Sequence, residues 1–272
     1  MTISLSSDRP FWLLGCGNMA GAMLTRWLET GLDPAAVTII DPSRASAPAG
    51  VRLLAAPPQG EAPPALLMLG VKPQMFAAAS AGLAVKGSVI VSIMAGVDQA
   101  SLAQRLPGAR AIVRLMPNLP VALGKGVAIL HAPGADADAR ALADSLARPL
   151  GLALWVEDEA LVDAGTAVSG SGPAFVYRFI DAMAAGAEKL GFAADQAQAL
   201  ALATVEGAAA LASASVETPA ELAERVASPK GTTRAGLDVL DADGAIYDLV
   251  HRTLKAAADR AGELAAEARQ PG

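Results

Sequence analysis

Gly15-Cys16-Gly17-Asn18-Met19-Ala20 is the stretch that decides the fold, because it follows a short apolar run at residues 11–14 and leads into a helical pattern. In such a strand–turn–helix unit the first glycine allows a tight turn and the second lets the backbone approach a pyrophosphate. The small third residue lets helix and strand pack closely, and the helix N-terminus offers free N–H groups to the negative charge. An ordinary glycine turn is the alternative, but the flanking pattern favours a dinucleotide site. The residues assigned to it here are Gly15, Gly17, Asn18, Met19 and Ala20.

Apolar runs and helical patterns alternate through the first half of the chain, which is typical of a parallel sheet with crossover helices. Six prolines within residues 42–64 leave little room for a helix, so we expect the second crossover to be truncated. After about residue 157 only helical periodicity remains. We therefore predict an α/β protein, with a Rossmann-like doubly wound sheet in residues 1–157 and an all-helical domain in residues 158–272. The expected strands lie at 11–14, 37–40, 66–71, 88–93, 111–116, 127–130 and 152–156.

Four helices are expected in the second half. The first begins at Gly172-Pro173 and ends at Gly191, and capping-box spacings predict the next two starts at Asp195 and at Thr218. A last helix runs from about residue 245 toward residue 266. Their apolar stripes exceed what a domain of about 115 residues can bury, so we predict a helical dimer interface.

Composition excludes several classes of function. The 272 residues are 53% hydrophobic and 18% charged, which excludes global disorder, and a net charge of −6 with 4% aromatic residues disfavours a nucleic-acid partner. No uncharged stretch reaches the roughly 20 residues that span a bilayer, and no secretory signal is apparent, so we expect a cytoplasmic protein. Cys16, His131 and His251 are too few for a zinc site, so no metal is expected.

Asp41 closes the second expected strand, where a carboxylate can accept hydrogen bonds from the ribose hydroxyls of NAD. Arg44 follows three residues later and could instead hold the 2′-phosphate of NADP, which Asp41 would repel. The two signals conflict, and a solvated Asp-Pro turn is the structural alternative.

The next strands also end in candidate ligand-binding segments, since open α/β sheets bind ligands at the carboxyl ends of their strands. Gly70-Val71-Lys72-Pro73 and Met94-Ala95-Gly96 are assigned to the cofactor, although Lys72 could be a surface lysine. Asn118 follows the fifth strand and could bind a nicotinamide or a substrate, or simply serve a proline-rich turn.

Two loops of the helical half carry hydroxyl groups. Ser169-Gly170-Ser171-Gly172-Pro173 either caps the long helix or faces the cofactor cleft, and residues 228–237 form a loop whose hydroxyls and backbone donors suit a carboxylate or a helix cap. The chain shows no convincing Ser/His/Asp or Cys/His set, which disfavours hydrolysis. A dinucleotide site without an obvious acid or base fits an electrophile that is already activated, such as a protonated imine.

Together these motifs resemble the pyrroline-5-carboxylate reductase family, the last enzymes of proline synthesis. The resemblance covers most of the chain, because five segments occur in the family's order. They are 15–20, 71–74, Arg114 with 116–118, 169–174 and 228–237. It implies hydride transfer from NADPH or NADH to the imine carbon of 1-pyrroline-5-carboxylate, and an interlocked homodimer that often assembles further.

The resemblance also assigns substrate residues. Ser228 and Thr233 are expected to be catalytic, with the Thr233 hydroxyl on the ring nitrogen and main-chain N–H groups around Thr232 on the carboxylate. Ser171 and Glu159 are expected to border the substrate pocket. The departures from the family pattern are Lys230 in place of a usual glycine, the acidic Asp41, and the short segment 42–64, and the last two leave the choice between NADPH and NADH open.

Two alternatives stay open. A β-hydroxyacid dehydrogenase needs a lysine one turn into the helix after the Ser-Gly loop, whereas this chain has none before Lys189. A non-catalytic dinucleotide sensor would keep Gly15 and Gly17 but would need no substrate loop.

Overall fold

The computed structural model describes residues 5–269, and for residues 264, 265 and 267–269 it describes the backbone alone. The chain divides into two compact units, one made of the residues up to Gly170 with those from Ala257 onward, the other of Ser171–Ala256. The domain boundary expected at residue 157 marks the end of the strands and stays a prediction. The first unit continues beyond that point because the helix after the last strand packs on the sheet.

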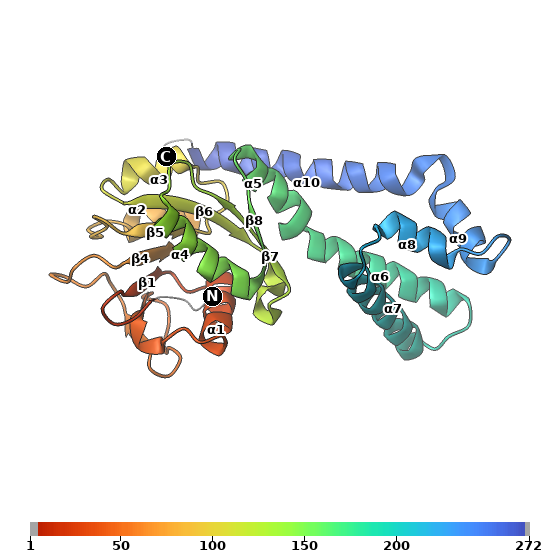
Figure 1. Cartoon of the computed structure of the whole chain (residues 1–272), viewed down its shortest axis with the longest axis horizontal. Coiled ribbons are helices and arrows are strands. Elements are labelled where there is room, and N and C mark those ends of the chain that lie inside the picture. The colour runs from red at the N-terminus through yellow and green to blue at the C-terminus, as the bar shows by residue number, and fades with distance from the viewer. Residues whose placement is uncertain (1–4, 270–272) are drawn as a thin grey trace. The chain divides into compact units, whose positions relative to one another are not determined.

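The first unit is built on an eight-stranded sheet (Figure 1), in the order β3-β2-β1-β4-β5-β6-β7-β8. β6 and β7 pair antiparallel and all other neighbours pair parallel. The carboxyl ends of β1, β4, β5 and β6 therefore meet at one edge. The strands are β1 (Phe11–Leu14), β2 (Val37–Ile40), β3 (Arg52–Leu54), β4 (Leu66–Leu69), β5 (Val89–Ser92), β6 (Ala111–Pro117), β7 (Gly126–His131) and β8 (Gly151–Trp155).

All seven expected strands are confirmed, and β3 was missed. It has only three residues, begins with the exposed Arg52, and pairs with β2 from Thr38↔Arg52 onward. Apolar periodicity cannot reveal so short a strand within a proline-rich segment. The truncated crossover is confirmed, since residues 41–65 contain no helix.

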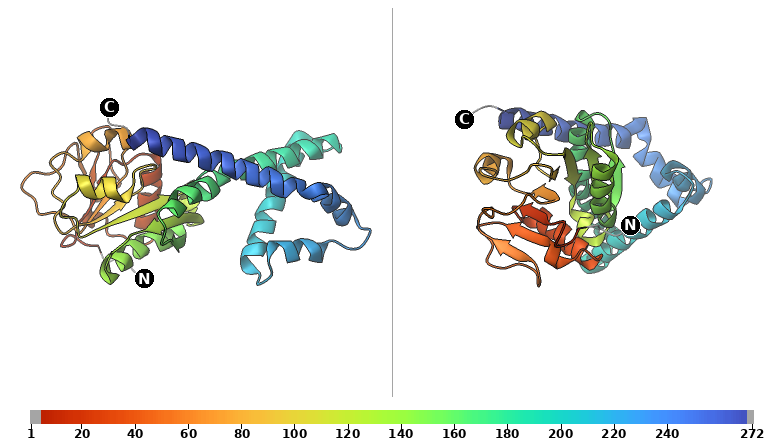
Figure 2. Two further views of the ribbon diagram at one scale, coloured as in Figure 1. Left: turned by 90° about the horizontal axis from the view of Figure 1, so that it is seen from above. Right: turned by 60° about the vertical axis from the view of Figure 1, so that its left-hand side comes forward.

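Helices cover both faces of the sheet (Figures 1 and 2). α1 (Asn18–Glu29) and α4 (Ala137–Ala147) pack on one face, whereas α2 (Phe76–Ala79) and α3 (Gln99–Arg105) pack on the other. α5 (Ala160–Gly165) extends the second layer over β6 and β7 through a small cluster of Met116, Ile129 and Val162. The central strands are thus buried on both sides, as their continuous apolar sequences require, whereas Leu152 and Leu154 of the edge strand β8 are exposed.

The packing of α1 follows from its spacing of large apolar residues. Met23 and Trp27 lie one turn apart on the buried face, and the Trp27 ring meets Phe11 of β1 edge-on with centroids 5.7 Å apart. The indole N–H of Trp27 donates to the Leu146 carbonyl of α4 at 2.7 Å, so the one buried polar atom of this side chain is satisfied.

The second unit contains helices and connecting turns but no strand in its described residues, and it begins directly after Gly170 of the first unit. A π-helical segment, Thr166–Gly170, precedes α6 (Gly172–Lys189), which packs against α7 (Ala194–Ala214). The capping box at Thr218 is confirmed at the start of α8 (Pro219–Val226). The start expected at Asp195 is wrong, because Ala193 holds the N-cap position and the Gln196 side chain accepts its backbone N–H. The sequence missed α9 (Thr232–Leu240), because it treats residues 228–237 as a loop, and the expected last helix is confirmed as α10 (Ala245–Arg269).

Apolar side chains remain exposed on this helical unit. Its buried cluster consists of Ala184, Ala197 and Ala201, all small residues at the α6–α7 contact. An apolar groove of about 540 Å³ runs between α6 and α10 and includes Phe179, which is 49% exposed. By length and composition alone α7 could cross a membrane, although a single such helix is weak evidence for one.

Candidate active site

The turn after β1 packs against the end of β4 with no room for side chains. Gly15 has φ +81°, and a Cβ there would lie 2.6 Å from Val71 Cγ1. A Cβ on Gly70 would lie 2.4 Å from the Gly15 carbonyl oxygen and 3.0 Å from the Cβ of Ala20. Gly15, Gly70 and the small Ala20 are therefore required by the close approach of the two segments, and the G-x-G-x-x-A pattern predicts Gly15 and Ala20.

Gly17 differs from these glycines, because a Cβ built there meets no protein atom within 4 Å. It occupies the N-cap of α1, and no side chain accepts the first N–H groups of that helix. The backbone is thus open to a ligand at the positive end of α1, where its free donors suit a phosphate group. This arrangement fits the pyrophosphate of a dinucleotide.

Asp41 and Arg44 both reach the same turn. Asp41 Oδ2 accepts the N–H of Cys16 at 2.9 Å, and Arg44 donates to the Cys16 carbonyl oxygen at 3.0 Å. Ser43 adds two bonds to Asp41 Oδ1. The carboxylate expected to favour NAD and the guanidinium expected to favour NADP therefore lie at the same turn, and the structure does not separate the two signals.

The ionisation of this cluster follows from its contacts. Partial burial works to raise the pKa of Asp41, but hydrogen bonds from Ser43 and Cys16 and the charge of Arg44 outweigh it and hold the pKa below its ordinary value. Burial raises the pKa of the Cys16 thiol, and Arg44 offsets this only in part. The thiol form of Cys16 is therefore favoured, which gives it little nucleophilic character.

A pocket of about 300 Å³ opens at the carboxyl ends of β4, β5 and β6. It gathers seven of the residues that the sequence assigned to the cofactor, and adds Ile93, Met116 and Pro117. Position at the end of a strand is the signal that could have found these three. The assigned residues that line it are Met19, Gly70, Val71, Lys72, Pro73, Met94 and Ala95.

Gly96 lies outside this pocket. It lines a neighbouring cavity of about 550 Å³ between α2 and α3, which shares Pro73 with the first. Its φ of +73° places it in the left-handed region, so a turn conformation accounts for this glycine.

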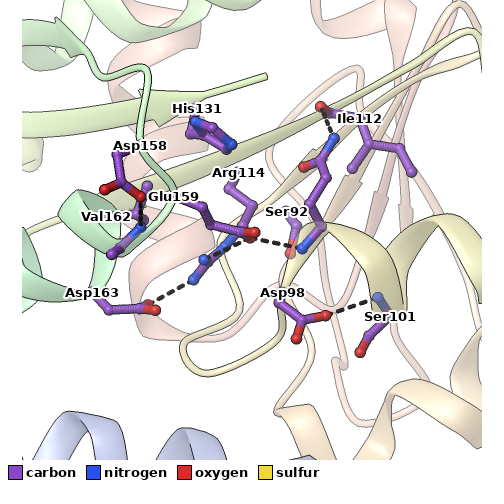
Figure 3. A network of polar contacts seen from close by, with 12 residues as sticks. Ser92, Asp98, Ser101, Ile112, Arg114, His131, Asp158, Glu159, Val162 and Asp163 are labelled. Atoms are coloured by element: carbon purple, nitrogen blue, oxygen red, sulfur yellow. Dashed lines mark hydrogen bonds and ion pairs between the residues drawn. The ribbon is translucent and has the colours of Figure 1, made fainter. Parts of the chain in front are cut away.

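Arg114 is the buried centre of an ion-pair network whose carboxylates are partly exposed (Figure 3). Its side chain is 2% exposed, and its guanidinium donates to Glu159 at 2.9 Å and to Asp163 at 2.8 Å. Glu159 Oε1 also accepts the backbone N–H of Gln99 at the start of α3, at 2.7 Å. These contacts fasten α5 to β6 and engage Glu159 within the first unit, so its expected place at the substrate pocket stays a prediction.

Asn118 is buried directly after β6. Its Oδ1 accepts the N–H of Val127 at 2.8 Å, and its Nδ2 donates to the Ser169 carbonyl oxygen at 2.9 Å. The expected contact with a nicotinamide stays a prediction, since the structure shows these two protein partners.

The Ser228 loop presents free donors. Gly231 is the N-cap of α9, and no side chain caps that helix, so the capping alternative for the hydroxyls is not what the structure shows. Ser228 Oγ folds against Gly231, where it would lie 2.3 Å from an added Cβ. Thr232 and Thr233 occupy the first turn of α9 and are exposed. Lys230 adopts φ +60°, a conformation that favours glycine.

Ser171 is the N-cap of α6 and likewise makes no side-chain cap bond. Its expected role on the substrate side stays a prediction. Among the side chains described within residues 5–269, no group of three or more His, Cys, Asp or Glu residues is arranged to hold a metal ion.

Comparison with known proteins gives this arrangement its context. Residues 159–264 match the family described as pyrroline-5-carboxylate reductase dimerisation, and residues 11–96 match the one described as NADP oxidoreductase, coenzyme F420-dependent. The chain is 37% identical to the pyrroline-5-carboxylate reductase of Pseudomonas aeruginosa, over 93% of this chain and 95% of the relative. The chain belongs to the pyrroline-5-carboxylate reductase family.

Solved structures agree with the pyrroline-5-carboxylate reductase assignment. The enzyme from Coxiella burnetii superposes with a TM-score of 0.87 at 31% identity, covering 94% of this chain and 98% of that one. The NADP-bound pyrroline carboxylate reductase of Plasmodium falciparum, 20% identical, shares the fold with a TM-score of 0.80, covering 97% of this chain and 100% of that one. The family's dimerisation segment coincides with the helices whose apolar side chains are exposed, which supports a homo-oligomer.

The open space at Gly17 leads to a prediction about cofactor binding. Gly17→Val should leave the chain folded, because a Cβ at this position meets no protein atom within 4 Å and a poorer N-cap costs about 1 kcal/mol. The side chain would occupy the pyrophosphate space, so NADPH affinity in a fluorescence titration should fall by about a hundredfold or more. Gly70→Ala is the contrasting variant, since its Cβ meets a carbonyl oxygen and should destabilise the fold by about 1–3 kcal/mol. Unchanged NADPH affinity in Gly17→Val would refute the assignment.

A second prediction concerns pH. The lowered pKa of Asp41 means that its ionised form stabilises the folded chain above the unfolded pKa of about 3.9, and that this contribution disappears as the pH falls through the folded pKa. Asp41→Asn should therefore lose less free energy of unfolding than wild type between about pH 5 and pH 2. Urea denaturation over this range measures the difference, and parallel curves for the two proteins would contradict it.

Proposed function

We propose that this protein reduces 1-pyrroline-5-carboxylate to L-proline with NADPH or NADH, acting in the cytoplasm. The observation that carries the proposal is the open backbone at Gly17 beside a pocket lined by the ends of β4, β5 and β6. In a chain of this family, that geometry supports a dinucleotide held along the carboxyl edge of the sheet. A sensor without catalysis would need no uncapped substrate loop before α9.

The chemistry asks for orientation more than for proton transfer. Bound NAD(P)H supplies a hydride, and the two electrons of that hydride form the new C–H bond at the imine carbon. The C=N π electrons move to the nitrogen, which already carries its proton, so no general acid is required. The residues of this chain therefore contribute by holding cofactor and imine, which can account for a large part of the rate enhancement.

The substrate is assigned to the Ser228 loop. The N–H groups of Thr232 and Thr233 start α9 without a cap and suit the substrate carboxylate. The Thr233 hydroxyl is assigned to the ring nitrogen and Ser228 to the carboxylate, as the family resemblance implies. Lys230 adds a cation to this loop and favours an anionic substrate.

Cofactor preference depends on two opposite charges that follow β2, those of Asp41 and Arg44. Arg44 favours the 2′-phosphate of NADPH, whereas the ionised Asp41 opposes it. Oxidation of NADPH and of NADH, measured in parallel with 1-pyrroline-5-carboxylate, tests both activity and preference. Cofactor binding without imine-dependent oxidation would favour the sensor and overturn the proposal.

We further propose that a second copy of the chain covers the apolar groove between α6 and α10, giving a homodimer that can assemble further. The groove lies within the family's dimerisation segment and is lined almost wholly by apolar side chains. Burial of such a surface against an identical one is the usual route to a symmetric dimer.

Loss of a loop hydroxyl should affect turnover. Thr233→Ala removes one hydrogen bond to a charged partner, worth about 1.5–3 kcal/mol, so kcat/KM for the imine should fall about tenfold to a hundredfold. Ser228→Ala should act in the same direction, and NADPH affinity should stay unchanged in both variants. Normal kinetics in the two variants would remove the loop from the substrate site.

A charge in the groove should break the dimer. Phe179→Asp places an unpaired carboxylate at the apolar surface between α6 and α10, which strongly opposes burial. Light scattering should then report a monomer at concentrations where wild type is dimeric. Leu123→Asp is the matched control, since Leu123 is 75% exposed in the first unit and outside the dimerisation segment. A dimeric Phe179→Asp variant would exclude the groove as the interface.

A further inference from the structure

Asn118 joins three segments of the chain through one amide group. The residue directly follows β6, its Oδ1 accepts the N–H of Val127 at the start of β7, and its Nδ2 donates to the carbonyl of Ser169 in the π-helical segment. The Asn118 side chain is 6% exposed, and both contacts are at least partly buried. Buried bonds of this kind are costly to lose, because the freed partner has no water to replace them.

The Ser169 carbonyl needs a side-chain donor because the backbone N–H that would normally bind it is missing. In a continuous α-helix it would accept the N–H of the fourth residue onward, but that residue is Pro173, which has no N–H. The next N–H, of Ala174, is taken by the Ser171 carbonyl at 3.0 Å. The amide of Asn118 thus replaces the donor that proline removes.

The π-helical segment is also held from its other side. A Cβ on Gly165 would lie 2.0 Å from Cδ1 of Ile129, so the chain enters the segment in direct contact with β7. Ser169 Oγ donates back to the Gly165 carbonyl at 2.9 Å. Short π-helical insertions of this type occur frequently at functional sites.

The contact lies beside the cofactor pocket. Met116 and Pro117, the two residues before Asn118, line that pocket at the end of β6. The carbonyl held by Asn118 belongs to the Ser-Gly-Ser-Gly sequence that includes the proposed substrate residue Ser171. One side chain therefore couples the pocket wall to the start of the substrate-side segment.

We propose that Asn118 is a positioning residue for hydride transfer, which fixes the Ser169–Ser171 segment against the pocket wall by replacing the missing N–H of Pro173. The proposal rests on the proposed reductase function and departs from the expectation that Asn118 binds the nicotinamide. It acts through the protein backbone, so its loss should lower kcat while leaving cofactor affinity intact.

The test uses four variants of the full chain. Asn118→Asp keeps an acceptor for Val127 but removes the donor to Ser169. Asn118→Ala with Pro173→Ala supplies a backbone N–H four residues after Ser169, and is compared with Asn118→Ala alone. Ser88→Ala is the matched control. The buried hydroxyl of Ser88 donates to the Pro64 carbonyl at 2.6 Å, at the amino ends of β4 and β5 and therefore away from the pocket at their carboxyl ends.

We expect kcat of Asn118→Asp to fall about tenfold or more, since a displacement of about 1 Å at a reacting centre can cost about a hundredfold. The Kd for NADPH should not change, and the Pro173→Ala change should restore much of the activity lost in Asn118→Ala. Ser88→Ala should lower the melting temperature without lowering kcat. A weakened NADPH affinity with normal kcat, an unchanged kcat, no rescue, or an equal kcat loss in Ser88→Ala would each overturn the proposal.

Hydrogen exchange separates this inference from the proposed function. Backbone amides of residues 166–172 should exchange about tenfold faster in Asn118→Asp than in wild type, because the segment loses a buried bond. Unchanged exchange overturns the positioning role even in an active enzyme. Faster exchange in a protein that does not reduce the imine would support the positioning role of Asn118 and reject the reductase function.

Discussion

The contact between the turn after β1 and the end of β4 is the constraint on which the rest of the site depends. The Gly15 carbonyl and Gly70 approach so closely that a single Cβ on Gly70 would lie 2.4 Å from the carbonyl oxygen. Because the two segments meet without side chains between them, α1 begins directly over the carboxyl edge of the sheet, and Gly17 opens its N-terminus to that edge. The ends of β5 and β6 then complete a pocket beside the helix start.

The ion pairs of Arg114 fix the chain after the last strand of the sheet. Arg114 lies on β6 with its guanidinium buried, and a buried charge is tolerated only when it is paired. Glu159 and Asp163 supply the partners from α5, and Glu159 also accepts an N–H at the start of α3. The ion pairs of Arg114 thereby hold α5, which leads through the π-helical segment to α6.

The helical unit follows a different logic. Its buried cluster is made of alanines, with the partly buried Ile180 and Met183 packed against it, while other large apolar side chains such as Phe179 remain exposed. Such a unit gains little from its own core, and its stability depends on a covering surface. The same unit presents the uncapped start of α9, which places the proposed substrate loop within the region that the family uses for dimerisation.

The sequence by itself determined the seven longer strands, the dinucleotide turn and four of the helices of the second half, because apolar periodicity and glycine spacing are local signals; it missed α9, which lies partly in the segment it treats as a loop. It also indicated that Asp41 and Arg44 both lie near the adenosine side of the cofactor, and the structure brings both side chains to the turn at Cys16. Only the tertiary structure decided how Glu159 and Asn118 are used, since their partners lie 45 and 51 residues away along the chain. It likewise revealed β3, whose three residues become a strand only through pairing with β2. Local pattern fixes which elements form, whereas the partners of a buried polar group are set by segments that meet only when the chain has folded.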